Sequence, residues 1–333
     1  MASGSEVVEY RADYPLYSLS WSCKEESPFR LAVGSFIEEC TNKVEILNVK
    51  DDALAREASF NHPYPATSVK WAPSSFKTSS SESDLLGTTG DFLRIWEYKN
   101  NQVKEKTCLK TTQNSEFYAP LTSMDWSEAD PKFVIAASID TTCTIWNIEN
   151  EVVQYQLIAH DKEVFDVAYA LESSDIFTTC GNDGSVRLLD LRALKQSSII
   201  YDSPGNIPLL RLAWNRQDPN LIATLPMGSS SIILLDVRVP SVPVCTLEDP
   251  KSVNKNTNIN AFTWAPHSAT HIATAGDNCQ ALIWDTKSPL PKKMEKPFLA
   301  YNAEAPISNI AWSRREADWI AIAFDDKVRM LKV

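Results

Sequence analysis

The side chains best suited to chemistry in this sequence are its four histidines, and only two of them stand at a suggestive spacing. His267 and His271 are four residues apart, the spacing at which two imidazoles on one helix can bind zinc. Pro266 precedes the pair and a strand-like apolar run follows it, which predicts a loop instead of a helix. We therefore expect no metal at these histidines.

His160 stands in the segment Ala159-His160-Asp161-Lys162, where a general base is conceivable. The alternative, which we expect, is a histidine that anchors a loop. The segment Gly181-Asn182-Asp183-Gly184 is typical of a hairpin turn, and no glycine-rich phosphate loop is found. Without a cluster of acid, base and nucleophile, the sequence predicts no enzyme activity and no cofactor.

Seven aromatic residues recur along the chain, each at the end of a short alternating strand pattern. They are separated by 43 to 55 residues, and a four-stranded propeller blade takes about 40–50 residues. The seven are Trp21, Trp71, Trp126, Tyr169, Trp214, Trp264 and Trp312. This period predicts an all-β fold, a seven-bladed β-propeller that occupies residues 1–333 as a single domain.

Each copy continues with a small apolar run, a tight turn and a further strand. The apolar runs, such as FVIAAS at 133–138, are typical of buried strands. Aspartate suits the turn because it tolerates left-handed backbone angles and can bond neighbouring amides. We assign that structural role to Asp91, Asp140, Asp183 and Asp277. The third strand often ends as in Ile283-Trp284-Asp285, which resembles the WD40 repeat.

In the WD40 family a histidine, a serine or threonine, the turn aspartate and the strand tryptophan can form a hydrogen-bonded tetrad. We expect no copy here to hold all four. Copy four keeps His160 and Asp183 without the tryptophan, whereas copies three and six lack the histidine. The blades should therefore be held mainly by apolar packing and strand ladders.

The seventh copy is one strand short, because only two strands fit after Trp312. Residues 6–10 precede the first copy and have the pattern of a strand. We expect this N-terminal strand to complete the last blade, since pairing of the two ends leaves no open edge. The polar segment 74–84 lies between two strands of copy two and is expected to be a surface loop, with a kinase site as the alternative.

Composition and charge narrow the possible partners. The formal net charge of −11 argues against direct binding to nucleic acid, which needs a basic surface. The sequence has no apolar stretch long enough to span a bilayer and no signal-peptide pattern at its start, which predicts a protein of the nucleus and cytoplasm. Its seven cysteines have no paired spacing and are expected to be buried thiols.

Longer strings suggest a narrower relationship. YPLYSLSW (14–21), RLAVGSFIEE (30–39), GDFLRIWE (90–97) and GNDGSVRLLDLR (181–192) are similar to segments of the plant Transparent Testa Glabra family and its relatives. Those relatives are light-regulated WD proteins and an animal family of cullin-ligase and kinase adaptors. The resemblance implies a non-enzymatic scaffold that joins MYB and basic helix-loop-helix transcription factors. Such a complex regulates flavonoid and anthocyanin synthesis and epidermal cell fate, including trichomes. The negative charge suggests that it favours basic segments of these partners.

The main alternative is a substrate receptor of a cullin-4 ubiquitin ligase, with a kinase scaffold as a third possibility. Leu189-Asp190-Leu191-Arg192 and Leu235-Asp236-Val237-Arg238 approximate the Trp-Asp-x-Arg signature by which many propellers dock on a cullin-4 ligase adaptor. Arg192 and Arg238 could reach a partner carboxylate, or they could satisfy the aspartate beside them.

Propeller ligands commonly meet the loops that lead into the innermost strands. Large side chains expected on that face are the candidates for partner binding, with packing between blades as their alternative role. These candidates are Tyr17, Tyr64, Tyr118, Lys162 and Phe165. The sequence departs from the family at 225–231, where the turn carboxylate is lost, and at 248–260, which is longer than usual. We therefore expect copies one to four to retain partner contacts best.

Overall fold

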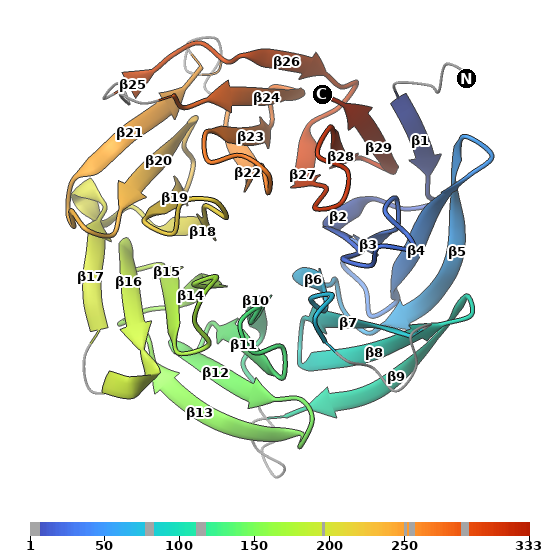
Figure 1. The fold of residues 1–333 in the computed structure, drawn as a ribbon, viewed down its shortest axis with the longest axis horizontal. Helices are drawn as coiled ribbons and strands as arrows, with labels where there is room; N and C mark the ends of the chain where they lie inside the picture. Colours follow the sequence, from blue (N-terminus) through green and yellow to red (C-terminus); the bar gives the residue numbers. More distant parts are fainter. Residues whose placement is uncertain are drawn as a thin grey trace.

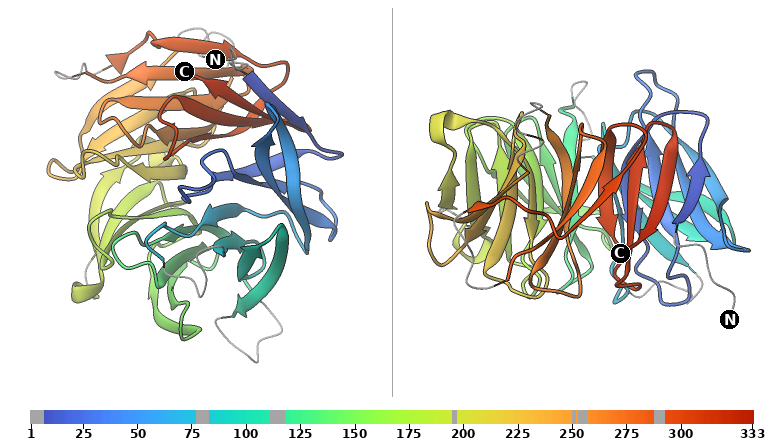
Figure 2. Two further views of the ribbon diagram at one scale, coloured as in Figure 1. Left: turned by 45° about the vertical axis from the view of Figure 1, so that its right-hand side comes forward. Right: turned by 90° about the horizontal axis from the view of Figure 1, so that it is seen from above.

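The computed structural model describes residues 7–76, 83–110, 118–194, 197–249, 252, 257–287 and 293–333. These residues form seven sheets arranged in a ring (Figure 1), and the innermost strands line a central channel. The side view shows strands running between two opposite faces of a disc (Figure 2). The predicted seven-bladed β-propeller is therefore confirmed.

Blades one to four use consecutive strands, counted from the channel outward. Blade one contains β2 (Leu16–Trp21), β3 (Leu31–Ser35), β4 (Asn42–Lys50) and β5 (Ala53–His62), and blade two contains β6 (Ser68–Trp71), β7 (Asp84–Thr89), β8 (Leu93–Lys99) and β9 (Gln102–Leu109). Blade three contains β10 (Leu121–Trp126), β11 (Phe133–Ser138), β12 (Thr142–Asn147) and β13 (Val152–Ile158). Blade four contains β14 (Val164–Tyr169), β15 (Ile176–Gly181), β16 (Ser185–Asp190) and β17 (Ser197–Asp202).

Blades five to seven depart from simple succession. Blade five contains β18 (Leu209–Trp214), β19 (Leu221–Pro226), β20 (Ser231–Asp236) and β21 (Pro243–Glu248). Blade six contains β22 (Ile259–Trp264), β23 (His271–Gly276), β24 (Gln280–Asp285) and β26 (Leu299–Asn302). Blade seven contains β27 (Ile307–Trp312), β28 (Trp319–Phe324), β29 (Lys327–Lys332) and β1 (Val7–Arg11). A short strand, β25 (Lys293–Met294), pairs in parallel with β21 as a fifth strand of blade five. The described residues also include the 3-10 turns η1 (Leu191–Ala193) and η2 (Pro204–Asn206).

The connections fall on two opposite faces because neighbouring strands of a blade run in opposite directions. We call upper the face with the loops that lead into each innermost strand and the turns between second and third strands. Backbone bonds join these loops and turns: Phe36 N donates to Pro15 O at 2.8 Å, and Met227 N to Pro208 O at 2.8 Å. The lower face carries the remaining loops and turns.

The hydrophobic core is distributed around the ring. Each of the seven apolar clusters combines side chains of two adjacent blades. Strand β7 is buried at all of its positions, because it has a strand on each side and a blade against each face. Full burial of one leucine such as Leu86 contributes about 1.5–3 kcal/mol, so adhesion between blades is a major source of stability.

The periodic tryptophans strengthen these contacts between blades. The indole nitrogen of Trp21 donates to Ala311 O at 3.0 Å, and that of Trp264 donates to Ala213 O at 3.2 Å. In both pairs the acceptor lies in the innermost strand of the preceding blade. Trp214 does the same, with its indole nitrogen 3.3 Å from Ala168 O, whereas Trp126 and Trp312 donate to carbonyls of their own blades. Three of the periodic tryptophans therefore also bond one blade to the preceding one.

The ring closes through its N-terminal strand, as the sequence predicted. β1 pairs antiparallel with β29, with Val8 opposite Met330. Val8 is buried, and Arg329 Nε donates to Glu9 Oε2 at 2.7 Å. The strand runs from Val7 to Arg11, one position later than predicted, and residue 6 lies outside the described residues.

Two further expectations can be compared with the structure. The seven cysteines are free; Cys23, Cys143, Cys180 and Cys245 are buried, Cys40 is exposed, and Cys108 and Cys279 are half-buried. The expectation of buried thiols thus holds for four of them. In the polar segment 74–84, residues 77–82 lie outside the described residues. No helix in the described part of the chain has the length and apolar character to cross a membrane.

Deletion of residues 1–11 is expected to lower the melting temperature by on the order of 5 °C, because it removes β1 and exposes the edge of β29. Deletion of residues 1–6 alone spares β1 and should leave the temperature unchanged. Thermal unfolding followed by circular dichroism measures both. Equal melting temperatures for the two truncations would contradict the closure.

Candidate functional site

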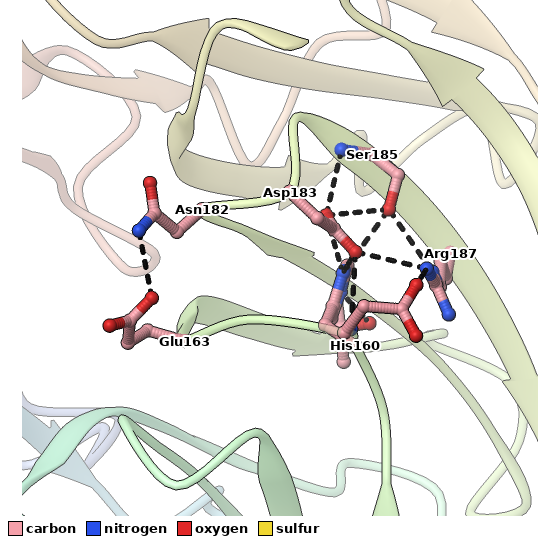
Figure 3. Close-up of polar contacts among 8 residues, drawn as sticks. His160, Glu163, Asn182, Asp183, Ser185 and Arg187 are labelled. Atoms are coloured by element: carbon pink, nitrogen blue, oxygen red, sulfur yellow. Dashed lines mark hydrogen bonds and ion pairs between the residues drawn. The ribbon is translucent and has the colours of Figure 1, made fainter.

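A buried polar network joins the upper loop and turn of blade four (Figure 3). His160 Nδ1 lies 2.9 Å from Asp183 Oδ1, and its Nε2 lies 2.8 Å from Thr179 Oγ1. Ser185 Oγ donates to Asp183 at 2.8 Å, and Arg187 Nη2 donates to it at 2.9 Å. Burial opposes ionisation of Asp183, but its bonds with His160 and Ser185 outweigh that effect and hold its pKa well below the usual range.

This network holds the backbone in place. The side chains of His160, Thr179 and Ser185 are buried, so a substrate has no access to their nitrogen and oxygen atoms. Beside them, Asn182 donates to Glu163 at 2.7 Å, which adds a second bond between the turn and the loop (Figure 3). The structure therefore places His160 and Asp183 together, as the tetrad pattern suggested.

Blade two contains a network that the sequence pattern did not reveal. His62 Nε2 lies 3.1 Å from Thr88 Oγ1, and the Trp96 indole nitrogen donates to the same hydroxyl at 2.9 Å. Asp91 instead binds Arg94 at 2.5 and 2.9 Å. The expectation that no copy holds all four residue types was therefore wrong. His62 was missed because it ends an outer strand and is followed by proline, without the family's preceding glycine.

The other predicted turn aspartates make different contacts. Asp140 Oδ1 accepts bonds from the Thr142 amide at 3.0 Å and hydroxyl at 2.7 Å. Asp277 accepts a bond from the side-chain amide of Asn260 at 2.8 Å. In blade five, which lacks the aspartate, Ser229 Oγ accepts from the amide two residues later at 3.0 Å. A hydroxyl thus replaces the missing carboxylate in the divergent turn.

Seven residues, one in each blade, take equivalent positions at the upper ends of the innermost strands. In six blades a β-bulge interrupts the innermost strand at its second residue. The bulged residues are Tyr17, Thr122, Phe165, Leu210, Asn260 and Ser308. Thr67, directly before β6, takes the corresponding place in blade two. We call these seven residues the mouth ring.

Four members of the mouth ring bind the next blade. Each donates to the carbonyl of the first residue of the next innermost strand. The bonds run from Thr67 to Leu121 (2.8 Å), Thr122 to Val164 (2.7 Å), Asn260 to Ile307 (3.0 Å) and Ser308 to Leu16 (3.0 Å). A bond of this kind contributes about 1 kcal/mol. Tyr17, Phe165 and Leu210 make no such bond among the described residues.

Tyr17 instead reaches across the channel. Its hydroxyl accepts a hydrogen bond from Arg211 of blade five, whose guanidinium carbon lies 5.8 Å from the Tyr17 ring centre. The ring of Phe36 packs against Tyr17 with 5.7 Å between ring centres. Below them, the buried carboxylate of Asp166 accepts the Leu212 amide at 2.8 Å and interacts electrostatically with Arg211.

A single carboxylate joins three blades at the lower end of the channel. Glu128 Oε2 accepts a bond from Arg216 Nη1 at 2.9 Å, and Oε1 lies 2.6 Å from Arg314 Nη1. Burial raises the pKa of Glu128, but the two guanidinium groups outweigh burial and lower it to about 2. A cavity of about 280 Å³, lined by the innermost strands, contains all three residues in its wall.

The predicted partner-binding residues all lie on the upper face, but at different depths. Tyr64 is 46% exposed and Lys162 is exposed, both in loops. Tyr118 is half-buried, with its ring edge-on to a phenylalanine of blade two at 4.6 Å. Phe165 and Tyr17 are half-buried at equivalent mouth-ring positions of blades four and one, and the other three candidates lie outside the ring. Partner binding by all five stays a prediction.

Several exposed apolar side chains on this face were not singled out from the sequence. They are Phe36, Ile139, Ile207 and Met227. Large apolar residues inside loops and turns that should be polar were the available signal. Phe36 and Met227 lie in segments that have a second interpretation, as a family string at 30–39 and as a lost turn carboxylate at 225–231.

On the lower face, blades four and five end their third strands with the same geometry. Arg192 Nη2 lies 2.7 Å from Asp190 Oδ2, and Arg238 Nη2 lies 2.6 Å from Asp236 Oδ2. The arginine side chains are nevertheless 65% and 63% exposed. A bond to the local aspartate and a contact with a partner are therefore compatible.

Comparisons with known proteins identify the repeat. Residues 151–190 match the family described as WD domain, G-beta repeat. The DDB1- and CUL4-associated factor 7 homolog of Dictyostelium discoideum is 50% identical over 331 residues, which cover 98% of each chain. An uncharacterized WD repeat-containing protein of Schizosaccharomyces pombe is 32% identical, over 99% of this chain and 91% of that protein. A WD repeat-containing protein of Saccharomyces cerevisiae is 30% identical, over 99% and 77% respectively.

These similarities correct the functional expectation. The WD40 repeat is confirmed, but the assignment to the plant Transparent Testa Glabra family is wrong, since the 50% identity is to a DDB1- and CUL4-associated factor. The expected scaffold for MYB and basic helix-loop-helix factors in anthocyanin and trichome regulation is contradicted by the same finding. The quoted strings are similar across a set of related families, so they could not identify the branch.

Replacing Glu128 by Gln is expected to lower the free energy of unfolding at neutral pH by about 3 kcal/mol, which corresponds to a pKa lowered from 4.5 to about 2. Because the folded-state pKa is depressed, this stabilisation is complete above about pH 4.5 and is lost as the pH falls toward 2. Urea unfolding at neutral and acidic pH should show the difference between the two proteins shrinking on acidification.

Glu25→Gln is the matched control for this measurement. Glu25 pairs with Arg315 at 2.9 Å, but its side chain is 75% exposed, so its loss should have little effect on stability. A difference between wild type and Glu128→Gln that stays constant with pH would contradict the assigned role of Glu128.

Proposed function

The chain belongs to the family of WD-repeat proteins that includes the DDB1- and CUL4-associated factor 7 homolog of Dictyostelium discoideum, and from this we infer that it docks on DDB1. We propose a non-enzymatic substrate receptor of a cullin-4 ubiquitin ligase. The observation that carries the proposal is the pair of matching Asp–Arg groups on the lower face of adjacent blades, at Arg192 and Arg238.

In each pair the aspartate fixes the orientation of the arginine side chain and leaves part of its guanidinium group free to bind a partner. Nε and Nη2 of Arg192 bind Asp190, and the same two nitrogens of Arg238 bind Asp236. Among the described residues, Nη1 of neither arginine has a hydrogen-bond partner. The carboxylate therefore holds the guanidinium in one orientation and leaves donors for a carboxylate or carbonyl of a second protein.

Apolar residues beside the two arginines extend this surface. Leu194, Val239 and Val242 are 49%, 52% and 58% exposed. The Ser241 amide donates to Ile200 O at 2.7 Å, so the turn of blade five is fixed against the outer strand of blade four. Apolar area next to positioned arginines is the composition typical of the energetic centre of an interface.

Docking by the lower face would leave the upper face open. A rigid ring that is held on a ligase by one face can present a second protein on the other face. The two proteins then share a raised effective concentration without new chemistry. This arrangement supports a receptor role because the two candidate surfaces lie on opposite sides of the disc.

Replacing Arg192 and Arg238 together by Ala is expected to weaken DDB1 binding at least about tenfold, which corresponds to about 1.4 kcal/mol. The truncation removes the exposed donors and the stems that orient them. Binding of the purified chain to immobilised DDB1 can be measured by surface plasmon resonance. Unchanged circular dichroism would establish that the double variant is folded.

Lys287→Ala provides the matched control. Lys287 pairs with Asp285 at 2.7 Å at the same place in blade six and is 78% exposed. Its replacement removes an equivalent charge from another blade and should leave DDB1 affinity unchanged. Equal weakening by Lys287→Ala, or full affinity in the double arginine variant, would count against docking through blades four and five.

A further inference from the structure

We propose that the mouth ring binds an extended segment of a partner protein, one that carries a large apolar side chain flanked by lysine or arginine. The binding surface consists of Tyr17, Phe165 and Leu210, together with the exposed Phe36. It lies on the face opposite the Asp–Arg pairs. The inference therefore goes beyond the proposed docking on DDB1 and does not depend on it.

The first argument is that the apolar side chains of this surface do not form the hydrogen bonds that polar side chains form elsewhere in the mouth ring. At four mouth-ring positions a small polar side chain binds the next blade, as Thr122 binds Val164 O. Phe165 occupies the same bulged position in blade four, and the next innermost strand likewise begins with a residue, Leu209, whose carbonyl could accept a bond. A threonine at position 165 would therefore be expected to bond Leu209 O. An apolar side chain there forfeits a stabilising bond without entering the core. Side chains that sacrifice local stability are characteristic of functional surfaces.

The second argument is exposed apolar area. Phe36, Ile207 and Met227 are 48%, 45% and 44% exposed, although they occupy loops and turns of the upper face. Phe36 contacts Tyr17, and Ile207 lies three residues before Leu210. Large apolar groups left exposed on the same face of a protein indicate a surface that a partner covers.

The bond between Tyr17 and Arg211 links the two parts of this surface. Arg211 directly follows Leu210, so the bond spans the channel between the apolar positions of blade one and those of blade five. Because the Tyr17 hydroxyl accepts from Arg211, its own proton is available to a ligand, and no acceptor for it is found in the described chain. An extended segment offers such acceptors in its backbone carbonyls.

The third argument is charge. Four exposed carboxylates lie around the blade-one side of the mouth, and none of them makes an ion pair with a described residue. They are Asp13, Glu38, Glu39 and Asp325. Backbone bonds hold their loops together: Phe36 N donates to Pro15 O at 2.8 Å, and Leu16 N donates to Asp325 O at 2.8 Å. Negative charge beside an apolar surface favours, and steers, a segment with positive flanks.

The direct test is selection of short random peptides displayed on phage against the full chain. Enriched peptides should combine a large apolar residue with flanking lysine or arginine, and their affinity should fall as salt is raised. Enrichment of acidic or purely polar peptides, salt-insensitive binding, or no enrichment at all would overturn the proposal.

Variants of the mouth ring distinguish binding from folding. Phe165→Thr with Leu210→Thr should weaken binding of a selected peptide at least about tenfold, since the apolar anchors are lost. The same double variant should melt at the wild-type temperature or above, because each threonine can restore a bond to the next blade. Full peptide affinity in this variant would overturn the proposal.

Thr122→Val is the matched control. It removes one bond of the mouth ring, at 2.7 Å to Val164 O, and should lower the melting temperature while changing peptide affinity less than about twofold.

DDB1 binding is measured in parallel for every variant. Loss of peptide binding with intact DDB1 binding supports the mouth surface independently, and loss of DDB1 binding by the mouth-ring variants would contradict the separation of the two faces.

Discussion

The structure depends on contact between each blade and the next around a closed circle. No single centre holds the molecule together, because each apolar cluster is shared by two neighbouring blades. Polar contacts repeat this arrangement at three levels: the mouth ring at the top, Asp166 below it, and Glu128 at the bottom. The N-terminal strand contributes to this closed circle, because Val8 of β1 lies in the apolar cluster that blades seven and one share.

Both candidate functional surfaces lie at positions where the residues of some blades differ from those of the other blades. Small polar residues occupy the mouth ring where they bond the next blade, and large apolar residues occupy it where we propose that a partner binds. Similarly, the lower turns of blades four and five share an exposed arginine held by aspartate. The two candidate surfaces arise at equivalent positions of different blades, by substitution on an unchanged backbone.

The sequence predicted the ring, the strand runs and the closing strand, because a repeat imposes the same apolar spacing many times. It predicted function less well. Strings around Phe36 and Asp183 are similar among related families, so they could not separate a transcription-factor scaffold from a DDB1-associated factor. The network of His62 was also missed, because a pattern anchored on one dipeptide does not detect a histidine that reaches Thr88 from an outer strand.

The pairing of β1 with β29 has a consequence for how the chain acquires its fold. Glu9 and Arg329, which join the closing strands, are 320 positions apart. Contacts this remote raise the contact order and slow folding. During synthesis the other blades can form in succession, while β1 must wait for β29, which is made about 320 residues later. Until then its backbone groups form an open edge, so the nascent chain is most vulnerable to aggregation before the ring closes.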